Sequence, residues 1–155
     1  MKKILLLSTI AGIAASVAAV TPAMAQTATG SFTVNSTTTK LCTTPLAANI
    51  SLGEYNGTTV ATATTPIVFK CTATTPATVT LAAGNGSATA GILTPSGGGT
   101  PINYTLGVTD GSVIGLGLTT GTATDLTATG TVSVAANQNP TPGSYTDTVN
   151  VTVTY

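Results

Sequence analysis

The sequence predicts an all-β protein arranged as a β-sandwich. After residue 26, apolar and polar residues alternate in short runs, which is the period of a half-buried strand. Stretches rich in Gly, Pro, Asn and Ser separate these runs. No stretch shows a convincing helical period, and the abundant Thr is a β-branched residue that suits a pleated surface.

The alternation predicts a series of short strands, each with its apolar residues on one face. In the run 113–118, for example, Ile114, Leu116 and Leu118 should share the apolar face. Many short strands at this spacing favour an immunoglobulin-like β-sandwich. The predicted strands are 27–34, 49–55, 66–73, 77–83, 101–108, 113–118, 126–136 and 145–155. The predicted connectors are 82–91, 94–101 and 137–145.

The last predicted strand, 145–155, leaves a sheet edge to be explained. It places Val149, Val151, Val153 and Tyr155 on one face, and no further strand follows it. An edge strand exposes unpaired N–H and C=O groups that invite pairing with another chain. By count the sandwich is one strand short, so we expect an incomplete sandwich that lacks its final strand. These four residues are its predicted acceptor-groove strand.

The first predicted strand supplies a matching apolar ladder. Ala28, Gly30, Phe32 and Val34 lie at alternate positions. If this face continued further, it would place Lys40 inward, which is costly unless the amine reaches solvent. We therefore expect the apolar face to end near Val34. The polar stretch that follows should lead into a separate strand containing Cys42, so that the first strand is able to leave the domain.

The N-terminus has the pattern of a secretory signal peptide. Lys2 and Lys3 precede the apolar run 4–20, and Ala23 to Ala25 form a small-x-small cleavage site. A transmembrane helix is the alternative, which the Ser, Thr and Gly content and the cleavage site disfavour. We expect residues 1–25 to be removed and the chain to be exported.

The charges that remain after residue 25 are few. Two lysines and four acids give a net charge of −2, with no Arg and no His. Such a surface has no basic field for nucleic acid, and the chain lacks the His of a catalytic triad. The sequence therefore predicts neither an enzyme nor a cofactor site. We interpret the acids as solvated turn residues, and Asp110-Gly111 as a hairpin turn rather than half of a calcium loop. The charged residues are Lys40, Lys70, Glu54, Asp110, Asp125 and Asp147.

Two cysteines, Cys42 and Cys71, lie in the exported part of the chain. An even pair in an exported protein indicates one disulfide. That bond would stabilise the fold by roughly 3–4 kcal/mol on the chain-entropy estimate. Two free thiols or half of a metal site are the alternatives, and the absence of His makes a metal site improbable.

Five motifs together resemble a known family. They are "TATGSFTV" (27–34) followed by Cys42, "LGEY" (52–55), "VFKCTATTPATVTLAAG" (68–84), "INYTLG" (102–107) and "PTPGSYTDTVNVTVTY" (140–155). With them the chain resembles the spore coat protein U-like domain family, which includes pilin subunits of the archaic chaperone–usher pathway. The last motif is the most specific. The chain departs from many members in having no Trp and no Arg, and Leu52 stands where Phe is usual.

The resemblance implies a fold and an assembly mode. It implies an incomplete immunoglobulin-like sandwich whose open groove is filled by the N-terminal donor strand of a neighbouring pilin subunit. Before assembly a periplasmic chaperone fills the groove, and an outer-membrane usher receives the subunit. Chaperone–pilin donor-strand complementation is a recognised example of β-strand addition to an open sheet edge.

Two functions are compatible with these expectations. The first is a pilus subunit that forms a homopolymer on the cell surface, in attachment or biofilm formation. The second is a monomeric surface or coat protein whose own N-terminal segment fills the groove and which acts as a binding module. The sequence leaves pilus and coat roles open. The expected parts are a signal peptide (1–25), a donor-strand segment (26–39) and a pilin domain (40–155).

Overall fold

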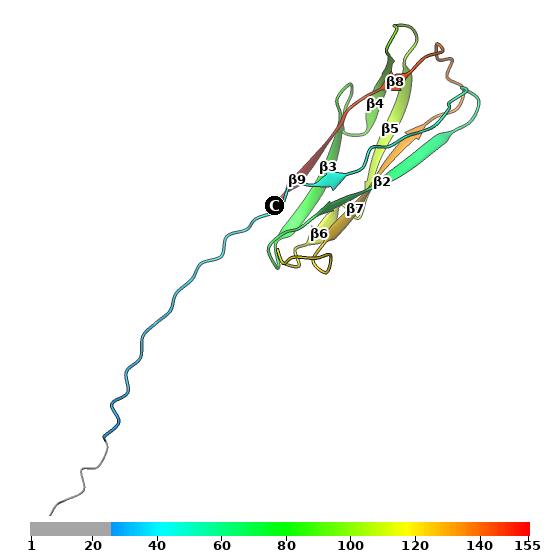
Figure 1. Ribbon diagram of the computed structural model, residues 1–155. Coiled ribbons are helices and arrows are strands. Elements are labelled where there is room, and N and C mark those ends of the chain that lie inside the picture. Colours follow the sequence, from blue (N-terminus) through cyan, green and yellow to red (C-terminus); the bar gives the residue numbers. More distant parts are fainter. Residues whose placement is uncertain (1–25) are drawn as a thin grey trace, which may run out of the picture. The chain divides into compact units, whose positions relative to one another are not determined.

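The computed structural model describes residues 26–155, so the predicted signal peptide, 1–25, lies outside the described residues. The chain divides into two units, Met1–Ser36 and Thr37–Tyr155. In the described part of the first unit, residues 26–36 form no strand and are exposed. The second unit is the β-domain drawn in Figure 1. No helix long and apolar enough to cross a membrane occurs in residues 26–155.

The domain is all-β, as the alternation predicts. The described residues contain nine strands and no helix. The strands are β1 (Leu46–Ala47), β2 (Ala61–Phe69), β3 (Pro76–Ala83), β4 (Ala90–Pro95), β5 (Ile102–Thr109), β6 (Ser112–Ile114), β7 (Leu126–Val134), β8 (Tyr145–Thr146) and β9 (Val149–Thr154). Most of the predicted strands are thereby confirmed, with exceptions described below.

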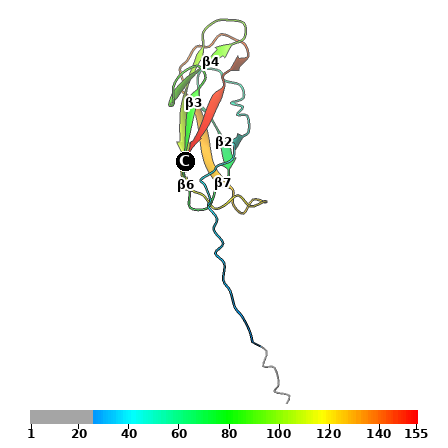
Figure 2. The same ribbon diagram turned by 90° about the vertical axis from the view of Figure 1, so that its left-hand side faces the viewer.

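The strands form two sheets that face each other (Figures 1 and 2). The larger sheet has the order β1-β2-β7-β5-β4-β8, and the smaller has the order β6-β3-β9. Every pairing is antiparallel. Strand β9 pairs with β3 from Val149↔Ala83 to Thr154↔Thr78, and no strand among residues 26–155 pairs with its other edge. This two-sheet arrangement confirms the predicted sandwich.

Alternating side chains build the core between the sheets. In β3 every second residue is buried, β7 follows the same rule, and β5 follows it as far as Leu106. Burying side chains of this kind stabilises the fold by roughly 1.5–3 kcal/mol each for the larger ones. The buried hydrophobic residues are Ile67, Phe69, Cys71, Ala77, Val79, Leu81, Ala83, Ile102, Tyr104, Leu106, Leu126, Ala128, Val132 and Val134.

The predicted disulfide between Cys42 and Cys71 is present. The two residues also form an isolated antiparallel bridge. Backbone bonds flank it, because Thr43 N donates to Lys70 O at 2.8 Å and Thr72 N donates to Leu41 O at 2.9 Å. The bond therefore joins the start of the domain to the end of β2. Cys42 lies in this bridge rather than in a full strand, since β1 begins only at Leu46.

The predicted strand 49–55 is wrong. This stretch has no strand in the structure and is irregular instead. Gly53 has a φ of +70°, which breaks an extended chain, and its N–H lies 3.4 Å from the Ser51 hydroxyl oxygen. The predicted apolar residues still contribute, because Ile50, Leu52 and Tyr55 pack against the core.

The predicted apolar face of 113–118 is also wrong. Val113 packs against the core, whereas Ile114 and Leu116 are 56% and 58% exposed and Leu118 is exposed. The strand ends at Ile114, but backbone bonds of 2.8 and 2.7 Å still join Gly115 to Thr74 and Thr75, and Gly115 is buried. The odd-numbered residues of this stretch therefore face the core, whereas the prediction placed the even-numbered ones there.

Two further differences concern turns and loops. Asp110 and Gly111 do form a tight turn, with Asp110 at a φ of 53°, but β5 and β6 belong to different sheets. The predicted hairpin is therefore a crossover between the sheets. The connectors predicted around residue 90 enclose a strand, β4, which was missed because turn-forming Gly, Ser and Pro residues surround it.

The predicted strand 145–155 is divided in two. Its first part, β8, pairs with β4 in the larger sheet, and its second part, β9, pairs with β3 in the smaller sheet. The break falls at Asp147 and Thr148. The predicted connector 137–145 does carry the chain from β7 to β8. The end of the chain therefore crosses from one sheet to the other.

Candidate strand-binding groove

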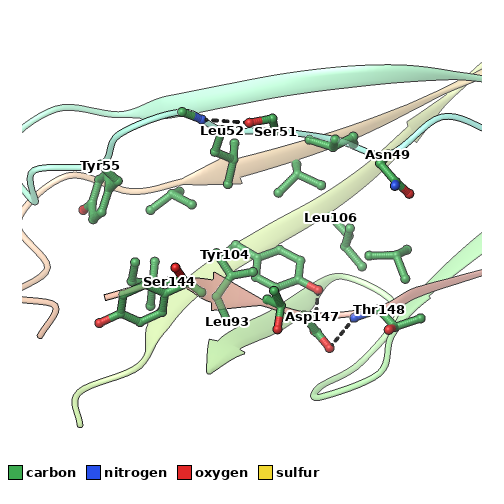
Figure 3. Close-up of a pocket in the computed structure, with 18 of the residues that line it drawn as sticks. Asn49, Ser51, Leu52, Tyr55, Leu93, Tyr104, Leu106, Ser144, Asp147 and Thr148 are labelled. Carbon is green, nitrogen blue, oxygen red and sulfur yellow. Dashed lines mark hydrogen bonds between the residues drawn. The ribbon is translucent and has the colours of Figure 1, made fainter. Parts of the chain in front are cut away.

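A cavity of about 1230 Å³ lies between the two sheets. Residues 47–56 border it along one side, and residues 139–149 border it along the other. In Figure 3, Leu52 and Tyr55 face Leu93 and Tyr104 across this space. Apolar side chains from β2, β5 and β7 form much of the remaining wall, namely Ile67, Ile102, Leu106, Val132 and Val134. The cavity therefore has a largely apolar floor and borders that carry many polar residues, and we call it the groove below.

Strand β9 forms one margin of the groove. Val149 and Val151 line it and are half-buried. Val153 is half-buried against the core without lining the groove, and Tyr155, just beyond the strand, is 51% exposed. The structure therefore brings two of the four predicted acceptor residues to the groove.

Three tyrosines line the groove, and each has its hydroxyl bonded elsewhere in the domain. Tyr55 donates to Ala135 O at 2.5 Å. Tyr145 donates to Thr100 O at 2.9 Å. Because these hydroxyl groups already have partners, the tyrosines offer a guest mainly their apolar rings.

The third tyrosine, Tyr104, is bonded to a carboxylate. Its hydroxyl donates to Asp147 Oδ2 at 2.7 Å, and Asp147 Oδ1 accepts from Thr148 N at 2.7 Å and from Asn85 N at 3.2 Å. Burial raises the pKa of Tyr104 well above its usual value, and the hydrogen bond and negative charge of Asp147 raise it further. Burial, the hydrogen bond and the negative charge all favour the neutral hydroxyl that donates this bond.

Two glycines make room for this pair. A Cβ on Gly91 would lie 2.2 Å from Cζ of Tyr104, and a Cβ on Gly84 would lie 2.9 Å from Thr148 O and 3.1 Å from Asp147 Oδ1. The Tyr104 ring therefore packs directly on the β4 backbone. This contact fixes the place where the chain crosses between sheets.

The expectation that all four acids are solvated turn residues is wrong for Asp147. This carboxylate is half-buried and accepts three hydrogen bonds. A signal was present in the sequence, because Asp147 has the same parity as Val149 and Val151 and so belongs to the inward face. Asp125 also has a partner, with Lys70 Nζ at 3.3 Å from its Oδ1.

The predicted donor residues lie outside every strand of the structure. Ala28, Gly30, Phe32 and Val34 are exposed, Phe32 by 89% and Val34 by 80%. Their role as a donor strand stays a prediction.

An antiparallel sandwich with a groove of largely apolar floor beside a half-paired edge strand defines a β-domain suited to strand addition. The chain belongs to the Spore Coat Protein U domain family, whose model matches residues 28–152. This is a family of structural, pilin-like domains. Comparisons with curated proteins and with solved structures found no match.

Proposed function

We propose that this protein is a secreted structural subunit of a surface pilus that polymerises by donor-strand complementation. The observation that carries the proposal is the groove beside β9, whose outer edge is unpaired within residues 26–155. An incoming strand would satisfy the backbone groups of β9 and cover Val149 and Val151.

The N-terminal segment of a neighbouring copy has the chemistry of that strand. Ala28, Gly30, Phe32 and Val34 alternate with polar residues, so one face is apolar. Burying Phe32 and Val34 would stabilise the joint by roughly 1.5–3 kcal/mol each. Each backbone hydrogen bond to β9 would add roughly 0.5–1.5 kcal/mol. The acceptor strand comprises Val149, Val151, Val153 and Tyr155.

The proposed partners follow from this mode of assembly. A periplasmic chaperone covers the groove until an outer-membrane usher delivers the subunit, and neighbouring copies then extend the polymer. A contact that uses different surfaces on each copy does not close on itself and builds a fibre. Such a fibre on the cell surface would serve attachment or biofilm formation.

A single-residue comparison tests the proposal. In the full chain, Phe32→Asp places a charge on the apolar face of the donor segment, whereas the matched control Thr33→Asp places it on the polar face. We expect Phe32→Asp to abolish the ladder of oligomers on unboiled gels and Thr33→Asp to retain it. Equal ladders from the two variants would contradict the donor assignment. A wild-type chain that stays monomeric at high concentration would indicate a groove filled by the chain's own segment.

A further inference from the structure

The two ends of the sandwich differ, and strand β7 connects them. The loop 115–125 precedes Leu126 at one end of β7, and Ala135, which follows Val134 at the other end, accepts the hydrogen bond of Tyr55. A strand of nine residues spans about 30 Å. The features at these two ends therefore meet only when two copies are arranged head to tail.

The first end is an exposed apolar surface beside the start of the domain. The stretch 70–72 lies between Leu41 and Gly117. Thr72 N donates to Leu41 O on one side, and Gly117 N donates to Cys71 O on the other. Leu41, Leu116 and Leu118 are all exposed here. We call these three residues the leucine end, and Lys40 immediately precedes Leu41 in the chain.

The loop that carries Leu116 and Leu118 is anchored by Lys70, whose side chain is half-buried. Lys70 Nζ donates to Thr119 O at 2.8 Å and to Gly121 O, and it pairs with Asp125 at 3.3 Å. Gly117 N is bonded to Cys71 O at 2.9 Å. A loop that is already ordered loses less conformational entropy when it meets a partner.

The second end carries the opposite charge. Glu54 is exposed and borders the groove, and Val60, also exposed, precedes the first residue of β2. The neighbouring chain is anchored there by Tyr55 and by the bond of 2.7 Å from Asn137 N to Gly57 O. We call Glu54 and Val60 the glutamate end.

Lys40 and Glu54 are the available pair of opposite charges at opposite ends, because the other exposed acid without an ion pair among residues 26–155, Asp110, follows β5 at the same end as Lys40. The other lysine of residues 26–155 is Lys70, whose charge is already paired with Asp125. Within the described residues neither Lys40 nor Glu54 has an ion-pair partner, and both are exposed. Opposite charges at opposite ends favour head-to-tail contact and disfavour contact between like ends.

The proposed donor strand would bring these ends together. All pairings in the domain are antiparallel, and a strand that continues this pattern along β9 places Val34 beside Val149. Val149 follows Asp147 by two residues, and Asp147 is bonded to Tyr104, which pairs with Val134 at the end of β7. The Val149 end of β9 is therefore the glutamate end. Five residues, 35–39, lie between Val34 and Lys40, and the six steps from one to the other span at most about 20 Å.

We propose that the leucine end and Lys40 of one copy dock on the glutamate end of the next copy, with Lys40 paired to Glu54. This second contact rests on the proposed function, because the inserted donor strand holds the two copies together. It adds side-chain contacts outside the groove and sets the angle between successive domains.

Charge reversal tests the proposed pair. In the full chain, Lys40→Glu and Glu54→Lys should each slow polymerisation about three- to fivefold at low ionic strength, the range of an exposed ion pair. The double variant should return to near the wild-type rate. The control Asp110→Asn changes an exposed charge that is not part of the proposed pair and should have no effect. Single variants that assemble like wild type, or a double variant without rescue, would overturn the pairing.

Leucine substitutions test the apolar part of the contact. Leu116→Ser with Leu118→Ser should slow assembly while the melting temperature of the monomer stays unchanged. The matched control, Ile92→Ser with Val108→Ser, removes exposed apolar residues elsewhere and should assemble normally. If Phe32→Asp abolishes polymers but none of these variants has an effect, the docking contact is wrong and the donor-strand function stands. Polymers formed by Phe32→Asp would instead contradict the function itself.

Discussion

Tyr104 donates a hydrogen bond of 2.7 Å to Asp147 on one side of the groove. Tyr104 belongs to β5 in the larger sheet, and Asp147 lies between β8 and β9, where the chain crosses to the smaller sheet. The bond therefore connects the wall of the groove to the start of its edge strand. Because β9 begins two residues after Asp147, the pair determines where the open edge starts.

The raised pKa of Tyr104 predicts a loss of stability at high pH. A tyrosine in the unfolded chain ionises near pH 10, whereas the folded domain holds Tyr104 neutral beyond that value. Its contribution is fully present below about pH 10 and is lost as the pH rises toward the folded pKa, because the unfolded state releases its proton first. Urea unfolding at a series of pH values should show this decline. Tyr104→Phe should remove this tyrosine's share of it, and an identical slope in both proteins would contradict the assignment.

Removal of the carboxylate at the crossing should loosen the start of β9. Asp147→Ala leaves the Tyr104 hydroxyl and the N–H groups of Asn85 and Thr148 without their acceptor. We expect a loss of roughly 1.5–3 kcal/mol in the free energy of unfolding. Faster amide hydrogen exchange at Asn85 and Thr148 should accompany it. Asp110→Asn, in an exposed turn, serves as the control and should leave both measurements unchanged.

A methyl group under the Tyr104 ring should be destabilising. Gly91→Ala places its Cβ 2.2 Å from Cζ of Tyr104, so the ring or the β4 backbone must move. Such overpacking costs roughly 1–3 kcal/mol. Gly97→Ala is the matched control, because its Cβ would meet nothing within 4 Å. Thermal unfolding of the two variants should therefore separate clearly, and equal melting temperatures would refute the packing argument.

Loss of the disulfide should destabilise the domain without changing its strands. Cys42→Ser with Cys71→Ser opens a link across a sequence separation of 29 residues. The expected loss is roughly 3–4 kcal/mol in the free energy of unfolding. Denaturant unfolding of the double variant measures it, with the reduced wild-type protein as a second test. A loss well below 1 kcal/mol would show that the link adds little constraint to the unfolded chain.

Alternation located most strands, but it failed where local geometry overrides the pattern. Ile50 and Leu52 are apolar and alternate, yet Gly53 bends the chain and the backbone there joins no ladder. In 113–118 the alternation persists in the opposite phase, with Val113 and Gly115 facing inward, because β6 pairs with β3 in the smaller sheet. In β4 the turn residues on both sides concealed a short strand that needs β5 and β8 as partners.

The groove itself was predictable only in part. The residues of β9 were identified by their parity, and Val149 and Val151 do line the groove. The tyrosines and Asp147 were not predicted to line the groove, because they come from segments far apart in the sequence. Tyr55 and Ala135 are 80 positions apart, and Tyr104 and Asp147 are 43 positions apart.

The sequence by itself determined the all-β class and the two-residue period of the core, since side-chain direction in a strand depends only on neighbouring residues. It also determined the pairing of the cysteines, because an exported chain with only two cysteines has a single possible disulfide. Only the tertiary structure decided which strands are partners, that the last predicted strand is shared between two sheets, and that a carboxylate holds its crossing point. The physical reason is that a period of two specifies which face of a strand is buried, whereas the choice of partner depends on contacts between residues remote in the chain.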